Sequence, residues 1–349
     1  MRISLLAQER NNNFNLLRFL AATAVIFSHS YALTGHSIDE PLLRWSDGAT
    51  YFGLLGVTLF FIISGFLVSK SLAERRTVRA FAAARALRIY PGLVAATLFS
   101  AALAGALSTV SWGEFLVDPE TYRFVTRNSL GWYIKYVLPG AFVDNPYPRI
   151  VNGSLWSVPI ELSMYVCCAI AGVVPLLSRR RWFNTAFIAG FVLFAVRPDW
   201  FVLFPRIPHV RLLTLAFAFG ALAWVNRDEI ALSPWVAGVA LLLLAVNPAD
   251  IVRGPASVAL LTYVLLTLAL HPKLRLAGFN RVGDYSYGLY VYAFPIQQAL
   301  VHVQRDLGPF ALFAAAFALT LLVAIASWHG MEKPALGLKS RFTNRLQPA

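Results

Sequence analysis

Two ionisable side chains, Arg18 and His29, stand in the apolar stretch "RFLAATAVIFSH" near the start of the sequence. An α-helix turns about 100° per residue, so this spacing places both on one face, roughly 16 Å apart along the axis. Ionisable groups inside a membrane helix face a protein interior or a wet cavity, and they mark a functional site more often than a structural pair. The imidazole is suited to act as a general base near neutral pH.

A glutamate, Glu161, stands in a second apolar stretch, "NGSLWSVPIEL". Glu161 and His29 lie at similar depths in their predicted helices, roughly 7 to 10 Å from the same, outer side of the membrane. A carboxylate beside an imidazole would fix its tautomer and stabilise the imidazolium. The spacing is equally compatible with Glu161 pairing with Arg18, or with its capping a broken turn at Pro159.

Two arginines, Arg85 and Arg88, stand three residues apart in "RALRIYP", directly before another apolar stretch. Two guanidinium groups on one helical face suit a ligand that is rich in phosphate. The neighbouring cations from Lys70 to Arg79 are better explained as charges that face anionic lipid. The pair therefore predicts a phosphate site.

These residues require a membrane-embedded helical frame, and the composition favours one. Of the 349 residues, 58% are hydrophobic and only 13% are charged, and the mean hydropathy is +0.62. We predict an all-α, multi-pass membrane protein with a single domain over 1–349 and no fused soluble domain. The ten predicted transmembrane spans are approximately 15–34, 49–72, 91–109, 154–176, 182–197, 209–225, 232–247, 254–270, 285–303 and 308–330.

The charges between these spans predict the orientation. With the N-terminus inside, the inner connections hold 19 of the 30 lysines and arginines and 6 of the 17 acids, whereas the outer connections hold 10 of each. The positive excess lies on one side, as the positive-inside rule requires. We therefore expect both termini in the cytoplasm, and we attribute the net charge of +13 to orientation in the membrane and not to nucleic-acid binding.

Five motifs then occur in a familiar order. They are the arginine and histidine of the first stretch, "FFIISGFL" at 60–67, "RALRIYP" at 85–91, "NGSLWSVPIEL" at 152–162 and "YSYGLYVYAFP" at 285–295. With them, the chain resembles acyltransferase family 3 over nearly its whole length. These are integral membrane O-acyltransferases that acetylate or succinylate cell-surface and secreted glycans. One departure is that many members have a histidine where this chain has Ala293, so any role of that histidine is absent or has moved.

The resemblance implies an acyl-CoA-dependent O-acyltransferase in the bacterial cytoplasmic membrane. It would move an acyl group, most simply acetyl, from cytoplasmic acyl-CoA to a hydroxyl of a glycan or lipid-linked saccharide. Acyl-CoA is then a co-substrate, membrane lipids surround the protein, and neither a permanently bound cofactor nor a metal is expected. In this sequence His29 would act as general base or transient acyl acceptor supported by Glu161, and Arg18, Arg85 and Arg88 would bind acyl-CoA. Further candidates for lining the acceptor site are Trp156, Tyr287, Tyr290 and Ser64.

The alternative is a transporter or flippase of a glycan or lipid-linked substrate. It would also use ten spans and charged groups inside the membrane. Transporters typically contain repeats with broken helices at matching positions, and the sequence displays none. Release of CoA that depends on the acceptor and on His29 distinguishes the two classes, because a transporter consumes no thioester.

Overall fold

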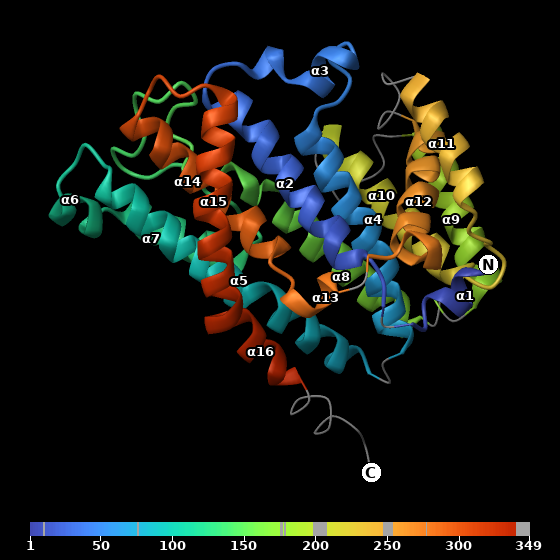
Figure 1. Ribbon diagram of the computed structural model, residues 1–349. Coiled ribbons are helices and arrows are strands. Elements are labelled where there is room, and N and C mark those ends of the chain that lie inside the picture. Colours follow the sequence, from blue (N-terminus) through green and yellow to red (C-terminus); the bar gives the residue numbers. More distant parts are fainter. Residues whose placement is uncertain are drawn as a thin grey trace.

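The computed structural model describes residues 1–9, 11–74, 77–174, 177, 179–197, 208–246, 254–276 and 278–339. Over these residues the protein is a bundle of helices (Figure 1). The β contact among them is one isolated bridge between Arg2 and Ala231. The α16 end of the bundle lies at the bottom of Figure 1, and the opposite α3 end lies at the top.

Among the described residues, ten helices form the body of the bundle and shorter ones lie around it. The long helices are α2 (Phe14–Leu33), α4 (Phe52–Ala73), α5 (Val78–Ala106), α8 (Val158–Val173), α9 (Arg180–Val196), α10 (Pro208–Val225), α11 (Pro234–Val246), α12 (Pro255–Leu270), α14 (Ser286–Val303) and α15 (Pro309–Ser327). The short ones are α1 (Ile3–Leu6), α3 (Pro41–Trp45), α6 (Trp112–Val117), α7 (Pro119–Leu130), α13 (Phe279–Val282) and α16 (Lys333–Gly337). A 3₁₀ turn at Gly153–Ser157 leads into α8, and a π-helical turn at Trp328–Glu332 joins α15 to α16.

Within the described residues, five helical stretches are long and apolar enough to cross a membrane. They are Phe14–Leu33, Phe52–Ala73, Val78–Ala106, Gly153–Val173 and Pro309–Gly337. They confirm the prediction of an all-helical, multi-pass membrane protein. Each of the other predicted spans also contains a helix, but these are shorter or less apolar, so the count of ten and the orientation stay predictions. The predicted span residues 175–176 and 247 lie outside the described residues.

Helix α5 begins earlier than the predicted third span, at Val78 instead of 91. The Thr77 hydroxyl caps this start by accepting a hydrogen bond from the backbone N–H of Ala80 at 3.2 Å. Residues 78–88 are rich in alanine and arginine, which favour helix, so the chain stays helical up to and through Pro91. As a result Arg85 and Arg88 belong to one continuous helix that reaches into the bundle.

The connection predicted as a long loop at 110–153 contains two helices. Ser111 and Glu114 form a capping box at the start of α6. Asp118 caps α7, whose first residue is a proline. Both cap signals are present in the local sequence. The remainder, 131–152, runs without regular helix to the start of the 3₁₀ turn.

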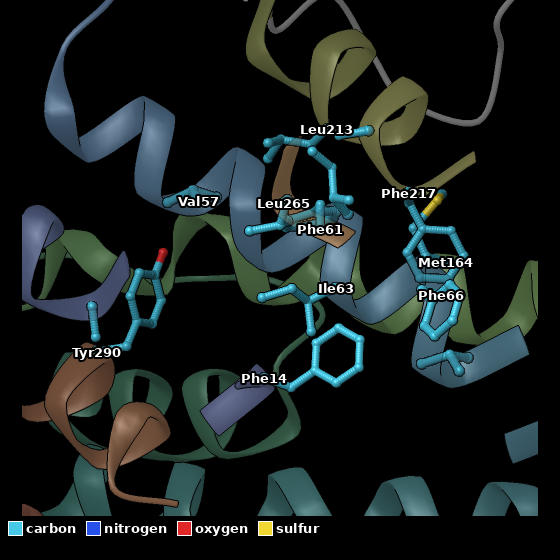
Figure 2. Close-up of a cluster of buried hydrophobic side chains, with 14 of the residues drawn as sticks. Phe14, Val57, Phe61, Ile63, Phe66, Met164, Leu213, Phe217, Leu265 and Tyr290 are labelled. Carbon is cyan, nitrogen blue, oxygen red and sulfur yellow. The ribbon is translucent and has the colours of Figure 1, made fainter. Parts of the chain in front are cut away.

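Helix α4 lies at the centre of the core. In the most apolar 18-residue stretch of α4, 72% of the residues are buried, which is the largest share among the five spanning stretches. Figure 2 shows side chains of α4, including Phe61 and Phe66, among those of α10 and α12, including Leu213, Phe217 and Leu265. Helix α4 therefore packs against several helices, and one neighbour lies closer than the others.

That neighbour is α10, and two glycines allow its approach. A methyl group built on Gly65 of α4 would overlap the backbone carbonyl oxygen of Phe217. One built on Gly220 of α10 would overlap the carbonyl oxygen of Ile62, and it would lie 2.9 Å from the backbone nitrogen of Phe66. The two helices therefore touch through backbone atoms, as small residues permit between membrane helices.

Replacing Gly220 by alanine is expected to destabilise the protein by about 2 kcal/mol, because the obstructing atoms are backbone and cannot rotate away. The matched control is Gly238→Ala on α11, where a methyl group meets nothing within 4 Å. That substitution is expected to be neutral or slightly stabilising, since alanine favours helix. Thermal unfolding in detergent measures both. Equal melting temperatures for the two variants would contradict the close approach of α4 and α10.

Helix α14 contains Pro295, which has no N–H to donate to the carbonyl oxygen of Val291 one turn earlier. The fully buried side chain of Asn152 replaces that donor, with its Nδ2 2.8 Å from the Val291 oxygen. The same Nδ2 also donates to the Ser100 hydroxyl at 3.3 Å. This contact ties α14 to α5 and to the 3₁₀ turn before α8, so it fixes the helices that surround the site.

Candidate active site

A cavity of about 300 Å³ lies between α2, α4, α5, α8 and α14. The predicted site residues that line it are Arg18, Ser64, Arg85, Arg88, Glu161, Tyr287 and Tyr290. Trp328, Leu336 and Lys339, from the π-helical turn and the α16 region, complete the wall at the α16 end. Residues from well-separated parts of the sequence are therefore brought to one place by the helix packing.

Two of the arginines share one carboxylate that the sequence analysis did not single out. Asp284, just before α14, has its Oδ2 3.3 Å from Nη1 of Arg18 and 2.5 Å from Nη2 of Arg88. The hydroxyl of Ser286 donates to the other carboxylate oxygen at 2.5 Å. Burial raises the pKa of Asp284, but the guanidinium groups of Arg88 and Arg18 outweigh it and hold the pKa below its ordinary value. Asp284 therefore joins α2, α5 and α14 through a charged contact.

A second missed acid, Glu332, lies on the other side of Arg88. Its Oε2 is 3.8 Å from Nη1 of Arg88, and its Oε1 accepts from the Ser327 hydroxyl at 3.1 Å. The Arg88 guanidinium also lies 5.8 Å from the ring of Trp328 and 5.9 Å from that of Tyr287. Arg88 is thus held by two carboxylates and lies beside two aromatic rings, while it also lines the cavity.

Arg85 differs from the other two arginines. Within the described residues it forms no ion pair, and its Nε is buried without a hydrogen-bond partner. Its guanidinium lies 5.8 Å from the ring of Tyr165 and lines the cavity. A half-buried cation that has no carboxylate partner favours an anionic ligand. Of the predicted phosphate-binding pair, Arg85 is therefore better able than Arg88 to form hydrogen bonds to a phosphate group.

Glu161 is held by Tyr165, four residues later on α8. The Tyr165 hydroxyl donates to Oε1 of Glu161 at 2.5 Å, and both side chains line the cavity. This spacing of one helical turn is a local signal that the sequence analysis missed. The carboxylate is thereby turned along α8.

The two tyrosines of α14 also line the cavity, and their hydroxyls contact neighbouring elements. Tyr287 donates to the carbonyl oxygen of Ile89 at 3.1 Å. Tyr290 and Ser157 share a hydrogen bond of 2.7 Å. Ser64, on α4, is buried with 6% of its surface exposed. These contacts engage the hydroxyl groups of both tyrosines, so the hydroxyls hold neighbouring elements together.

His29 is not among the residues that line this cavity. Its ring and that of Phe294 form a T-shaped contact with 5.1 Å between centroids, and its Nδ1 is buried without a hydrogen-bond partner. In the part of the chain that the structure describes, His29 and Glu161 form no hydrogen bond with each other, and this pairing was one of the alternatives that the sequence left open. The physical reason is that Tyr165 holds the Glu161 carboxylate, which lines the same cavity as Arg18.

Trp156 also lies outside the cavity. It is half-buried in the 3₁₀ turn before α8, where its ring centroid is 6.1 Å from that of His209. The ring of Tyr51 lies 6.3 Å from the same histidine. The predicted place of Trp156 in the acceptor site therefore stays a prediction.

A bundle of membrane-crossing helices around an internal cavity lined with arginines and carboxyl groups defines a multi-pass membrane protein with a buried polar site. The chain belongs to acyltransferase family 3, whose family model, described as an acyltransferase domain, matches residues 11–329. The protein is therefore a membrane acyltransferase, as the motifs predicted.

Two relatives match along nearly their whole lengths. An O-acetyl transferase of Shigella phage Sf6 is 28% identical over 347 residues, which cover 97% of this chain and 98% of the relative. Nodulation protein 10 of Rhizobium leguminosarum bv. viciae is 26% identical over 374 aligned positions, covering 96% of this chain and 95% of the relative. No solved structure matches the chain.

Proposed function

We propose that this protein transfers an acyl group, acetyl in the simplest case, from cytoplasmic acyl-CoA to a hydroxyl of a cell-surface or exported glycan. The observation that carries the proposal is the cavity that gathers Arg18, Arg85, Arg88 and Glu161. The name of the phage relative, an O-acetyl transferase, supports transfer to oxygen. The acceptor is a glycan or a lipid-linked saccharide.

In this proposal the ten long helices all cross the bacterial cytoplasmic membrane, with both termini and the α16 end in the cytoplasm. Acyl-CoA then enters from the α16 end, where the arginines lie. Arg85 binds phosphate directly, and Arg18 and Arg88, oriented by Asp284, contribute positive potential beside it. The acyl group extends along α2 toward His29, three turns further on the same helix.

The reaction is acyl transfer between sulfur and oxygen. The acceptor hydroxyl oxygen forms a bond to the thioester carbonyl carbon, and the carbon–sulfur bond breaks. His29 takes the hydroxyl proton as general base and returns it to the departing sulfur, so that CoA leaves as the thiol. A variant, in which His29 itself carries the acyl group briefly, uses the same residues. Glu161, which lines the cavity, stabilises the positive charge that the His29 imidazole gains when it takes the proton.

The test of the donor site is Arg85→Gln. Loss of one charge-assisted contact to phosphate is expected to weaken equilibrium binding of radiolabelled acetyl-CoA by about 10- to 100-fold. Binding of acetylpantetheine, which lacks the nucleotide phosphates, is expected to be unchanged. Arg79→Gln is the matched control, because Arg79 is exposed on the same helix.

Two results would contradict the proposal. One is equal binding of acetyl-CoA by the Arg85 and Arg79 variants. The other is the absence of acetyl transfer when the wild-type protein receives acetyl-CoA and a detergent extract of bacterial lipid-linked saccharides and polysaccharides. A protein that moved such saccharides without releasing CoA thiol would belong to the transporter class.

A further inference from the structure

A buried glutamine on α14 holds the turn of α2 that carries His29. Gln297 is fully buried, and its Nε2 donates to the carbonyl oxygen of Ile26 at 2.9 Å and to the hydroxyl oxygen of Ser30 at 2.8 Å. The Ser30 hydroxyl in turn donates to the Ile26 oxygen at 3.0 Å. These contacts lie on both sides of His29 in the sequence. One side chain therefore fixes the backbone that presents the imidazole.

The orientation of this amide follows from its partners. A backbone carbonyl only accepts hydrogen bonds, so the group facing Ile26 must be the donating Nε2. The Oε1 of Gln297 then faces elsewhere, and it is buried without a partner. Buried polar atoms are paired in nearly all folded proteins, so an unpaired acceptor requires a function or a partner that is bound in another state.

The imidazole of His29 also has a buried nitrogen that lacks a hydrogen-bond partner. Its Nδ1 is also buried without a partner, and its ring packs against Phe294, one turn before Gln297 on α14. A histidine that works as a base through one ring nitrogen carries its proton on the other, and that N–H requires an acceptor. Gln297 Oε1 is a free acceptor on the helix that packs against His29.

We propose that Gln297 is a positioning residue of the reaction. It holds the His29 turn through Nε2, and its Oε1 accepts the hydrogen bond from Nδ1–H when His29 takes the proton of the acceptor hydroxyl. The two atoms are not bonded in this structure, so the step includes a change of the His29 side-chain rotamer. The proposal rests on the proposed role of His29 as general base, and it assigns to Gln297 the orientation and charge stabilisation of that base.

The experiment compares Gln297→Met, which keeps the length of the side chain and removes both polar atoms, with Gln298→Met. Gln298 is the matched control because it is equally buried on α14 but contacts Tyr147, Ile150 and Asn145, away from His29. The assay is transfer of labelled acetyl from acetyl-CoA to the extract of bacterial saccharides, followed as kcat and KM across pH.

Gln297→Met is expected to lower kcat by about 10- to 100-fold, with the KM for acetyl-CoA unchanged within about twofold. Loss of an acceptor destabilises the protonated imidazole, so the acid limb of the kcat profile moves to lower pH. Gln297→Glu keeps an acceptor and adds negative charge, so its acid limb moves to higher pH. Gln298→Met leaves the limb in place.

Movement of the acid limb in these opposite directions supports the proposal, because a merely structural role would lower activity without moving it. An unchanged kcat in Gln297→Met, or a lower kcat with an unmoved limb in both Gln297 variants, would overturn it. Should the methionine variant fail to fold, as judged by size-exclusion chromatography and acetyl-CoA binding, the glutamate variant decides alone. Failure of the proposed function is a separate result: the wild type would transfer no acetyl, or His29 variants would remain active.

Discussion

Glutamine in place of His29 is expected to reduce acyl transfer by about 10³-fold, within the range that a general base contributes. Glutamine fills most of the space of the ring but cannot accept a proton. Binding of acetyl-CoA is expected to stay unchanged, because His29 does not line the cavity that holds the arginines. Folding should be little affected, since Nδ1 of His29 makes no hydrogen bond that the substitution would remove. Turnover and equilibrium binding of labelled acetyl-CoA, measured on the same preparation, separate the two effects.

The control for this variant is His302→Gln. His302, also half-buried, lies near the end of α14, where its ring is 5.9 Å from that of Phe142 and its Nδ1 likewise has no partner. It should therefore report the cost of losing a half-buried imidazole without chemistry. More than a tenth of wild-type transfer in His29→Gln, or equal losses in both variants, would remove His29 from the reaction.

Asp284→Ala is expected to have the largest effect on stability, about 3 kcal/mol or more. Removing one member of a buried ion pair leaves the opposite charge without compensation. Here two cations, Arg18 and Arg88, lose the same partner, and the exposed fractions of their side chains are only 20% and 18%. The melting temperature in detergent should fall, and acetyl-CoA binding should weaken with it because the arginines lose their orientation.

The matched control is Asp306→Ala, an exposed aspartate just beyond the other end of α14. It is expected to change the melting temperature little, as is usual for isolated surface charges. Equal shifts for Asp284→Ala and Asp306→Ala would show that the charged contact contributes nothing.

The pH dependence of the Asp284 contribution has a definite sign. Since the pKa of Asp284 is held below its ordinary value, its ion pairs stabilise the folded state fully above the ordinary aspartate pKa. That stabilisation is lost as the pH falls through the lowered pKa. The difference between wild type and Asp284→Ala should therefore stay constant at neutral pH and shrink only in acid.

Much of the frame was predictable, because apolar segments long enough for a membrane are a property of local sequence. The predicted arginines at 18, 85 and 88 and the glutamate at 161 do line one cavity. Two relations within single helices were also predictable from helical spacing alone. Arg18 and His29 share one face of their helix, and Arg85 lies beside Arg88.

The partners of these residues were less predictable. Asp284 lies 266 residues from Arg18 in the sequence, and only the packing of α14 against α2 and α5 brings them together. Tyr165, in contrast, is one turn from Glu161 and was open to a local argument. Equal depth left the pairing of Glu161 with His29 as one of several alternatives, because the direction in which each side chain points depends on its own nearest neighbours.

Helix α14 and the segment just before it attach to α2 at two separated points, through Asp284 to Arg18 and through Gln297 to the turn around His29. Two anchors on one partner prevent either helix from sliding past the other. The distance along α2 between Arg18 and the His29 imidazole is then fixed. In the proposed reaction, this fixed distance would select donors by the length of the chain between phosphate and thioester. It would not select them by the size of the acyl group.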